Sequence, residues 1–254
     1  MIVKDDLLFA TMQANTGQNR GDYDGSQYRQ EQKENAAYPH GSGGGGTGGG
    51  LRDIIENGFP ETLYDADATK VAWNLFFQSS YIKNVDLPEA LKICESAFSN
   101  CQNLDSVNLP KVNEIEAYAF MECIQLRQLH IPSVKTIGMN AFRHCFFASI
   151  NLQNVSCIDR YAFAECNHLE KVDLVKAPSV YDGAFDGCDL LSVIICRDTE
   201  NVMIAKTTAI MDTPIASGQG FIYIPASMWD AYTAVYGDYM VMFRKIEDYP
   251  EICG

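Results

Sequence analysis

A short motif, Ala-Phe-x-x-Cys, recurs every 22 residues through the middle of this chain, with one interval of 21. Its phenylalanines are Phe98, Phe120, Phe142, Phe163 and Phe185. Self-similarity at a fixed period of this length is the signature of a solenoid, in which each repeat forms one coil that stacks on the coil before it. The period therefore constrains the fold class more strongly than any other feature of the sequence.

A pair of apolar residues, with one residue between them, begins eight or nine positions after each phenylalanine of the repeat. The pairs are Val85/Leu87, Val107/Leu109, Leu129/Ile131, Ile150/Leu152, Val172/Leu174 and Val193/Ile195. This alternation predicts a short strand with one buried face. Proline follows three of the pairs directly, at Pro88, Pro110 and Pro132, and ends the strand because it lacks a backbone donor.

Further apolar positions repeat with the same period. An isoleucine or valine stands five residues before each phenylalanine, at Ile93, Ile115, Ile137, Ile158 and Val180. Ala97, Cys101 and Leu104 fall at i, i+4 and i+7, which predicts a helical turn with these side chains on one face. The expected coil is therefore a strand, a turn, an apolar anchor and a helical turn.

Stacking is required for stability. Each coil buries about five or six apolar side chains at about 1.5 to 3 kcal/mol each. Ordering its backbone costs about 1 to 2 kcal/mol per residue, so one coil cannot fold alone. The prediction is an α/β solenoid of about five to six 22-residue coils with a short parallel β-ladder, capped at both ends.

The segments outside the repeats are predicted to differ in role. Residues 1–50 form a polar extension that ends in the glycine-rich stretch Gly41–Gly50, a flexible linker. Residues 51–80 are expected to be an N-terminal cap and degenerate first coil, with helices at Leu51–Asn57 and Asp67–Phe77 and with Ser79 in the place of the cysteine. The solenoid proper covers residues 81–200, and residues 201–254 form the C-terminal cap.

The C-terminal cap is expected to contain a strand and an amphipathic helix. The strand is predicted around Phe221–Ile224, and Pro225 and Ser227 are favourable residues at a helix start. Trp229, Tyr232, Val235 and Tyr236 would share one helical face. This face is predicted to cover the open end of the stack.

Charge and hydropathy limit the partners and the location. The formal net charge is -14, and so acidic a surface disfavours nucleic acid and anionic membranes as partners. No apolar run is long enough to cross a bilayer, so no membrane insertion is expected. Met1–Leu8 lacks the basic-then-apolar order of a signal peptide. The expected location is the bacterial cytoplasm or a phage virion, with surface exposure only as part of an assembly.

Catalysis, metal binding and cofactors are not predicted. The repeated cysteines occur once per coil, a spacing that follows the fold and not a tetrahedral ligand set, so they are expected to be buried thiols in a reducing compartment. The four histidines fall in no recognisable catalytic spacing. His144 adjoins Cys145, but neighbours on a helical turn point about 100° apart.

A polar ladder is the candidate binding surface. The residue between the two buried positions of each strand points outward, and others flank it on the same side. The candidate binding residues are Asp86, Asn108, Gln128, His130, Asn151, Lys171 and Asp173. The alternative interpretation is a solvated face without a ligand, which most solenoids also have.

The repeat resembles a known family. The pattern that runs from Val107-Asn108-Leu109-Pro110 through Ile115 to Ala119-Phe120-x-x-Cys123 and Leu126 resembles the BspA-type leucine-rich repeat. The segment Tyr223–Ser227 with Ala231-Tyr232 is similar to the C-terminal cap common in that family. The resemblance spans roughly residues 76–249 and implies binding, since such repeats occur in adhesive surface proteins of bacteria and protists and in gut bacteria and their phages.

Two functions follow as hypotheses. The first is a non-catalytic adhesion module that binds a protein or a polysaccharide and is tethered through residues 1–50 to a larger assembly, for which a phage virion or tail is a candidate. The second is a cytoplasmic leucine-rich repeat scaffold that binds an intracellular protein. They differ in the role of the extension.

Overall fold

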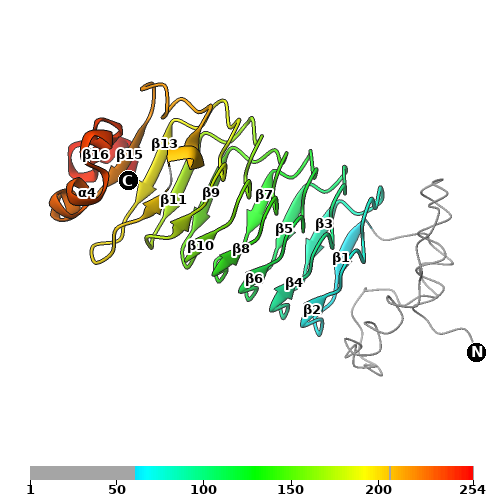
Figure 1. Cartoon of the computed structure of the whole chain (residues 1–254). Coiled ribbons are helices and arrows are strands. Elements are labelled where there is room, and N and C mark those ends of the chain that lie inside the picture. The colour runs from blue at the N-terminus through cyan, green and yellow to red at the C-terminus, as the bar shows by residue number, and fades with distance from the viewer. Residues whose placement is uncertain (1–60, 206, 254) are drawn as a thin grey trace, which may run out of the picture.

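The computed structural model describes residues 61–205 and 207–253. The extension 1–50 and the predicted helix Leu51–Asn57 lie outside the described residues. Figure 1 shows an elongated stack of coils, with β1 at one end and α4 at the other. The predicted solenoid is confirmed: parallel strands repeat along the stack and every coil pairs with its neighbours.

The first face of the stack carries the strands that the apolar pairs predict. The last pair, Val193/Ile195, is wrong by one residue, because Ile194 and Cys196 take the core positions of that strand. Val193 and Ile195 point outward, in register with Lys171 and Asp173. One sheet has the order β1-β3-β5-β7 and a second has the order β16-β15-β13-β11-β9. Their bounds are β1 Thr62–Tyr64, β3 Asn84–Asp86, β5 Ser106–Asn108, β7 Gln128–His130, β9 Ser149–Leu152, β11 Lys171–Leu174, β13 Val193–Cys196, β15 Phe221–Ile224 and β16 Phe243–Lys245. We call the outward side of these strands the strand face.

The apolar anchors form a second parallel ladder that the sequence analysis missed. Each anchor is the buried residue of a two-residue strand, and the strands pair in the order β14-β12-β10-β8-β6-β4-β2. Their bounds are β2 Lys70–Val71, β4 Lys92–Ile93, β6 Glu114–Ile115, β8 Thr136–Ile137, β10 Cys157–Ile158, β12 Ser179–Val180 and β14 Ile204–Ala205. Two residues are too few to show alternation, so the pattern gave no strand signal.

The predicted helical turn is wrong in conformation, although its buried residues are right. Ser96 and Asn100 have φ of 55° and 61°, which no α-helix contains. The N–H of Phe98 bonds the carbonyl of Ala119 in the next coil at 2.8 Å, and not a carbonyl four residues earlier. Ala97, Cys101 and Leu104 are nevertheless fully buried. Hydrogen bonds between coils thus replace those within a helix.

Phenylalanine rings stack through the core of the solenoid. Neighbouring rings from Phe76 to Phe185 have centroids 5.2 to 5.5 Å apart and nearly parallel planes. The cysteine of each coil donates its S–H to the carbonyl of the phenylalanine in the previous coil, as in Cys123 to Phe98 at 3.2 Å. The period of the sequence is therefore a period of packing and of hydrogen bonding.

The short coil between Phe142 and Phe163 interrupts the strand face. The strand pairing is absent between β7 and β9, although the second ladder continues through this coil. Phe147 is buried here, one position earlier than the leucine of the other coils, and its ring lies edge-on to Phe142 and Phe163 at 6.1 Å. A larger side chain thus fills the space in a coil that is one residue shorter.

The stack begins before the motif does. The predicted helix Asp67–Phe77 is wrong, because β2 and turns occupy this range and β1 and β2 pair with the next coil. Phe76 stacks on Phe98, and Ser79, in the place of the cysteine, is buried. Strand pairing therefore makes this range part of the repeat stack. A helix was predicted because the apolar spacing in this range suits a helix as well as a coil.

The C-terminal cap closes the other end of the stack. The 3-10 helices η1 (Thr207–Ile210) and η2 (Ala226–Met228) precede α4 (Trp229–Tyr236), which is followed by η3 (Gly237–Met242). Tyr232 is fully buried and Trp229 and Tyr236 pack against the core, as predicted, but Val235 is 52% exposed. Beyond β16 come η4 (Ile246–Asp248) and the short helix α5 (Pro250–Cys253).

Candidate functional site

The strand face is polar along most of its length. Asn108, Gln128, His130 and Asn151 are exposed there and Asp86 is half-buried. The register aligns Asp86, Asn108 and His130 in consecutive strands. Asn151 belongs to the second sheet, beyond the interruption, where it aligns with Asp173. The structure therefore brings the predicted residues to one side of the stack, in two groups.

Side chains on this face bond their neighbours in adjacent coils. Asn108 Nδ2 donates to Asp86 Oδ1 at 2.8 Å. Ser106 Oγ donates to Asn84 Oδ1 at 2.7 Å, and Asn84 Nδ2 donates to Thr62 Oγ1 at 3.2 Å. These bonds orient amide and hydroxyl groups that keep further donor or acceptor capacity, because each amide has two N–H donors and a carbonyl. The face therefore offers fixed, uncharged hydrogen-bonding groups at the spacing of the coils.

Lys171 and Asp173 have a different environment from the other predicted residues. Both are half-buried. Asp173 accepts two hydrogen bonds from Arg197, at 2.9 and 2.7 Å, and this pairing raises the pKa of Arg197. Lys171 Nζ donates to the carbonyl of Ile252 at 2.8 Å. The two residues hold another part of the chain, so the open part of the face ends at Asn151.

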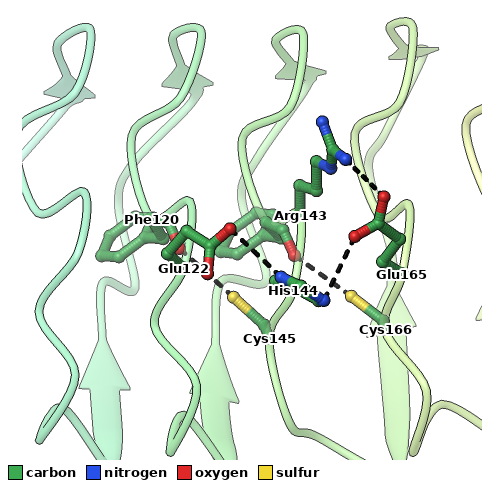
Figure 2. Close-up of polar contacts among 8 residues, drawn as sticks. Phe120, Glu122, Arg143, His144, Cys145, Glu165 and Cys166 are labelled. Atoms are coloured by element: carbon green, nitrogen blue, oxygen red, sulfur yellow. Dashed lines mark hydrogen bonds and ion pairs between the residues drawn. The ribbon is translucent and has the colours of Figure 1, made fainter.

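A charged cluster on another side of the coils was missed by the sequence analysis. His144 Nδ1 lies 3.1 Å from Glu122 Oε1, and Nε2 lies 3.1 Å from Glu165 Oε2 (Figure 2). Arg143 pairs with Glu165 as well. Each of Glu122, His144 and Glu165 stands two residues after a repeat phenylalanine. Comparing equivalent positions in successive coils would have revealed the cluster, whereas spacing within one coil did not.

The cluster offers no thiol–imidazole pair. Cys145 follows His144 but donates its S–H to the carbonyl of Phe120 at 3.3 Å, inside the core (Figure 2). Burial raises the pKa of the Cys145 thiol well above its ordinary value, which keeps the thiol protonated and a poor nucleophile. The histidine bridges two carboxylates of adjacent coils, so the arrangement connects coils and does not activate a nucleophile.

The described part of the molecule can also be compared with the geometry of cavities, metal sites and membrane spans. A cavity of about 20 Å³ lies between the last coils and the cap, with Phe185, Ile210 and Tyr236 in its lining, and it has room for little more than a water molecule. No group of three or more His, Cys, Asp or Glu side chains within 61–205 and 207–253 has an arrangement that holds a metal. Over the same residues, no helix has the length and hydropathy of a membrane span.

Comparison with solved structures shows similar repeat proteins. A leucine-rich repeat protein from Bacteroides ovatus is 26% identical, with 62% of this chain and 43% of that chain covered and a TM-score of 0.47. The T. pallidum leucine-rich repeat protein is 29% identical, with 54% and 67% covered and a TM-score of 0.49. The pneumococcal vaccine antigen PcpA is 14% identical, with 72% and 44% covered and a TM-score of 0.55, a likeness of fold.

The matched region spans less than half of the length of the Bacteroides ovatus protein and of PcpA. No curated protein matches the sequence. The family description "BspA type Leucine rich repeat region" matches residues 92–206 in 6 copies. With the stacked coils and parallel ladders described above, this match identifies residues 92–206 as BspA-type leucine-rich repeats.

Proposed function

We propose that this chain is a non-catalytic binding module whose ligand, a protein or a polysaccharide, docks along the open part of the strand face. The observation that carries the proposal is the set of exposed side chains at Asn108, Gln128, His130 and Asn151 on one side of the stack. Solenoids commonly use such extended surfaces for binding. The interaction class is adhesion, in which a large surface contributes many weak polar contacts.

The chemistry of the face favours a ligand with its own alternating donors and acceptors. Amide and imidazole groups both donate and accept hydrogen bonds, as do the main chain of an extended peptide and the hydroxyls of a sugar. Parallel strands lie about 4.8 Å apart, so groups repeat along the face at that interval. The net charge of -14 disfavours polyanionic ligands.

Binding to defined probes tests the face. The probes are a glycan array and immobilised fibronectin, fibrinogen and collagen. The triple variant Asn108→Ala, His130→Ala, Asn151→Ala should weaken binding to the recognised probe at least tenfold. A control triple variant carries Asn113→Ala, Lys135→Ala and Thr136→Ala, which are exposed outside the strand face. Equal binding by both variants, or no recognised probe, contradicts the proposal.

The proposed role of residues 1–50 is attachment. The glycine-rich stretch Gly41–Gly50 has the composition of a flexible linker, which lets the solenoid present its face away from the attachment point. The proposed assembly is a phage virion or tail, in which the particle itself would expose the module. Deleting residues 1–50 should leave a folded solenoid that binds the same probe and is absent from purified particles. Incorporation of the deleted chain into particles would rule out this tether.

A further inference from the structure

The strand face changes from polar to apolar at its C-terminal end. Val193 and Phe221 continue the row of Lys171, and Ile195 and Tyr223 continue the row of Asp173. Ile195 and Tyr223 are nonetheless buried, at 0% and 3% exposure. Outward positions of a strand are buried only when another segment covers them. We call the surface formed by Val193, Ile195, Phe221 and Tyr223 the apolar end of the face.

Residues 246–253, which we call the strap, cover this surface. Cys253 of the strap is buried together with Ile195 and Tyr223, and Ile246, Tyr249 and Ile252 pack around them. The Tyr249 ring lies edge-on to Tyr223 at 5.5 Å. Two side chains hold the strap by its carbonyls: Lys171 bonds Ile252 at 2.8 Å, and Arg197 bonds Cys253 at 2.6 Å.

The strap is structurally separate from the solenoid that it covers. Its apolar contacts form a cluster of their own, apart from the main core. In the described part of the chain, strand pairing ends at Lys245, and β13 and β15 each pair on both sides without the strap. Release of the strap would therefore break side-chain contacts while the ladders and the phenylalanine stack remain complete.

Charge is complementary across this contact. The strap carries Glu247, Asp248 and Glu251, whereas Lys171, Arg197 and Arg244 lie on the strands and loops beside it. Glu247 also accepts from the N–H of Ala226, at 2.9 Å. The surface beneath the strap thus combines apolar side chains with basic groups that bond main-chain carbonyls.

We propose that the strap is releasable and that the apolar end of the face is a docking surface for an acidic partner peptide with aromatic and aliphatic side chains. Such a peptide has the chemistry of the strap itself: side chains that fill the contacts of Tyr249 and Ile252, and free carbonyls for Lys171 and Arg197. The strap then closes this second surface until a partner displaces it.

Cys253 reports strap release in the full-length protein. Its thiol is buried by the strap contact, while the repeat cysteines Cys101, Cys123, Cys145 and Cys166 are buried in the core. Under native conditions, iodoacetamide labelling followed by peptide mass spectrometry should modify Cys253 at least a hundredfold faster than these core cysteines. Labelling of Cys253 at the rate of the core cysteines would mean that the strap opens only on unfolding, which overturns the proposal.

Two variants test whether Arg197 holds the strap in place. Arg197→Gln removes the donor to the Cys253 carbonyl and should raise the labelling rate of Cys253 at least tenfold. Burial raises the pKa of Cys253, and the nearby Arg197 partly opposes this rise. Loss of Arg197 would therefore by itself slow the reaction, so a faster rate reports opening. The control Arg127→Gln removes another pairing between coils, with Asp105, and should leave the rate unchanged. Equal rates in both variants would contradict an anchoring role of Arg197.

A peptide tests the docking surface. A synthetic peptide of residues 246–253 that carries the change Cys253→Ser is added to the full-length wild-type protein. If it takes the place of the strap, labelling of Cys253 should rise saturably with peptide concentration, whereas a scrambled peptide should have no effect. No rise at millimolar concentrations of peptide would show that the surface does not accept a partner in trans, and the docking proposal would then be wrong. The labelling experiments with the variants and with the peptide do not depend on ligand binding at Asn108 and His130.

Discussion

At the residue scale, each position of the repeat is set by one contact with the coil beside it. The phenylalanine contacts the rings above and below, and the cysteine has space for a small side chain whose S–H reaches a carbonyl one coil away. The recurrence of Ala-Phe-x-x-Cys is therefore a steric and hydrogen-bonding requirement repeated in each coil.

Phe142→Ala should be strongly destabilising. The ring lies 5.3 Å from Phe120 and 5.4 Å from Phe163 and also contacts Phe147, so its loss leaves a cavity between coils. We expect the free energy of unfolding to fall by about 3 to 5 kcal/mol in urea titrations followed by circular dichroism. Phe146→Ala, a half-buried neighbour, is the control and should cost much less. An unchanged midpoint for Phe142→Ala would refute the stacking register.

The buried thiols should make the protein sensitive to alkali. Burial raises the pKa of Cys101 and of Cys188 from 9.0 to about 12, and it also raises the pKa of Cys123. Between about pH 9 and pH 12, these thiols are deprotonated in the unfolded chain but stay protonated in the folded chain. Stability is thus complete below about pH 9 and falls as pH rises towards 12, by about 1.4 kcal/mol per pH unit for each thiol.

Thermal unfolding between pH 8 and pH 10.5 measures this effect. The melting temperature should decline over that range, and Cys123→Ala should show a shallower decline than the wild type because one buried thiol is gone. Identical slopes for the two proteins would mean that the thiols do not carry the pH dependence.

At the element scale, the cap stabilises an edge strand through phenol groups. β14 is the last strand of the second ladder. Tyr236 Oη accepts from the N–H of Ala205 at 2.8 Å and donates to the carbonyl of Met203 at 2.6 Å, and Tyr232 Oη accepts from the N–H of Met203 at 3.0 Å. An unpaired edge exposes backbone groups that invite association with other chains, and here side chains of the cap occupy them.

Tyr236→Phe should therefore weaken the cap. It removes a donor and an acceptor from the β14 backbone while keeping the ring, and we expect a loss of about 1 to 3 kcal/mol from the unpaired groups. Tyr239→Phe is the matched control, because this residue is 53% exposed, and it should leave the melting temperature within a degree. Equal stabilities of the two variants would show that water replaces the phenol without cost.

At the scale of the whole molecule, the solenoid is a one-dimensional stack in which each coil contacts its neighbours. Ion pairs such as Lys83 with Glu61, Lys111 with Glu89 and Arg127 with Asp105 each join one coil to the next. Stability is then approximately the sum of the coils and their interfaces, and a coil at the end has fewer interfaces to lose.

A substitution at the end of the stack should act locally. Phe76 stacks on Phe98 at 5.2 Å in the first described coil, so Phe76→Ala should raise hydrogen exchange mainly within residues 61–82. Phe142→Ala, in the middle, should raise exchange on both sides of its coil. Hydrogen exchange with mass spectrometry distinguishes the two patterns, and a global increase in Phe76→Ala would show that the whole solenoid opens as one unit.

The sequence alone determined the coil. A period of 22 with one polar position between two apolar ones fixes the stacking, the strands and the burial of Phe98, Cys101 and Leu104, because each depends only on equivalent neighbours. It also placed Asn108 and His130 on an outward side. These features are local in the sense that one coil and the next suffice to specify them.

The tertiary structure decided what depends on segments far apart in sequence. The pairing of Tyr236 with β14 and the covering of Ile195 by Cys253 join residues that no repeat spacing connects. The strap shows the physical reason: Ile195 lies on the outward side of its strand, where the sequence pattern did not place it, and the segment that covers it is settled only by the folded path of the chain. The sequence thus defined a repeat scaffold, and the fold set where its open face ends.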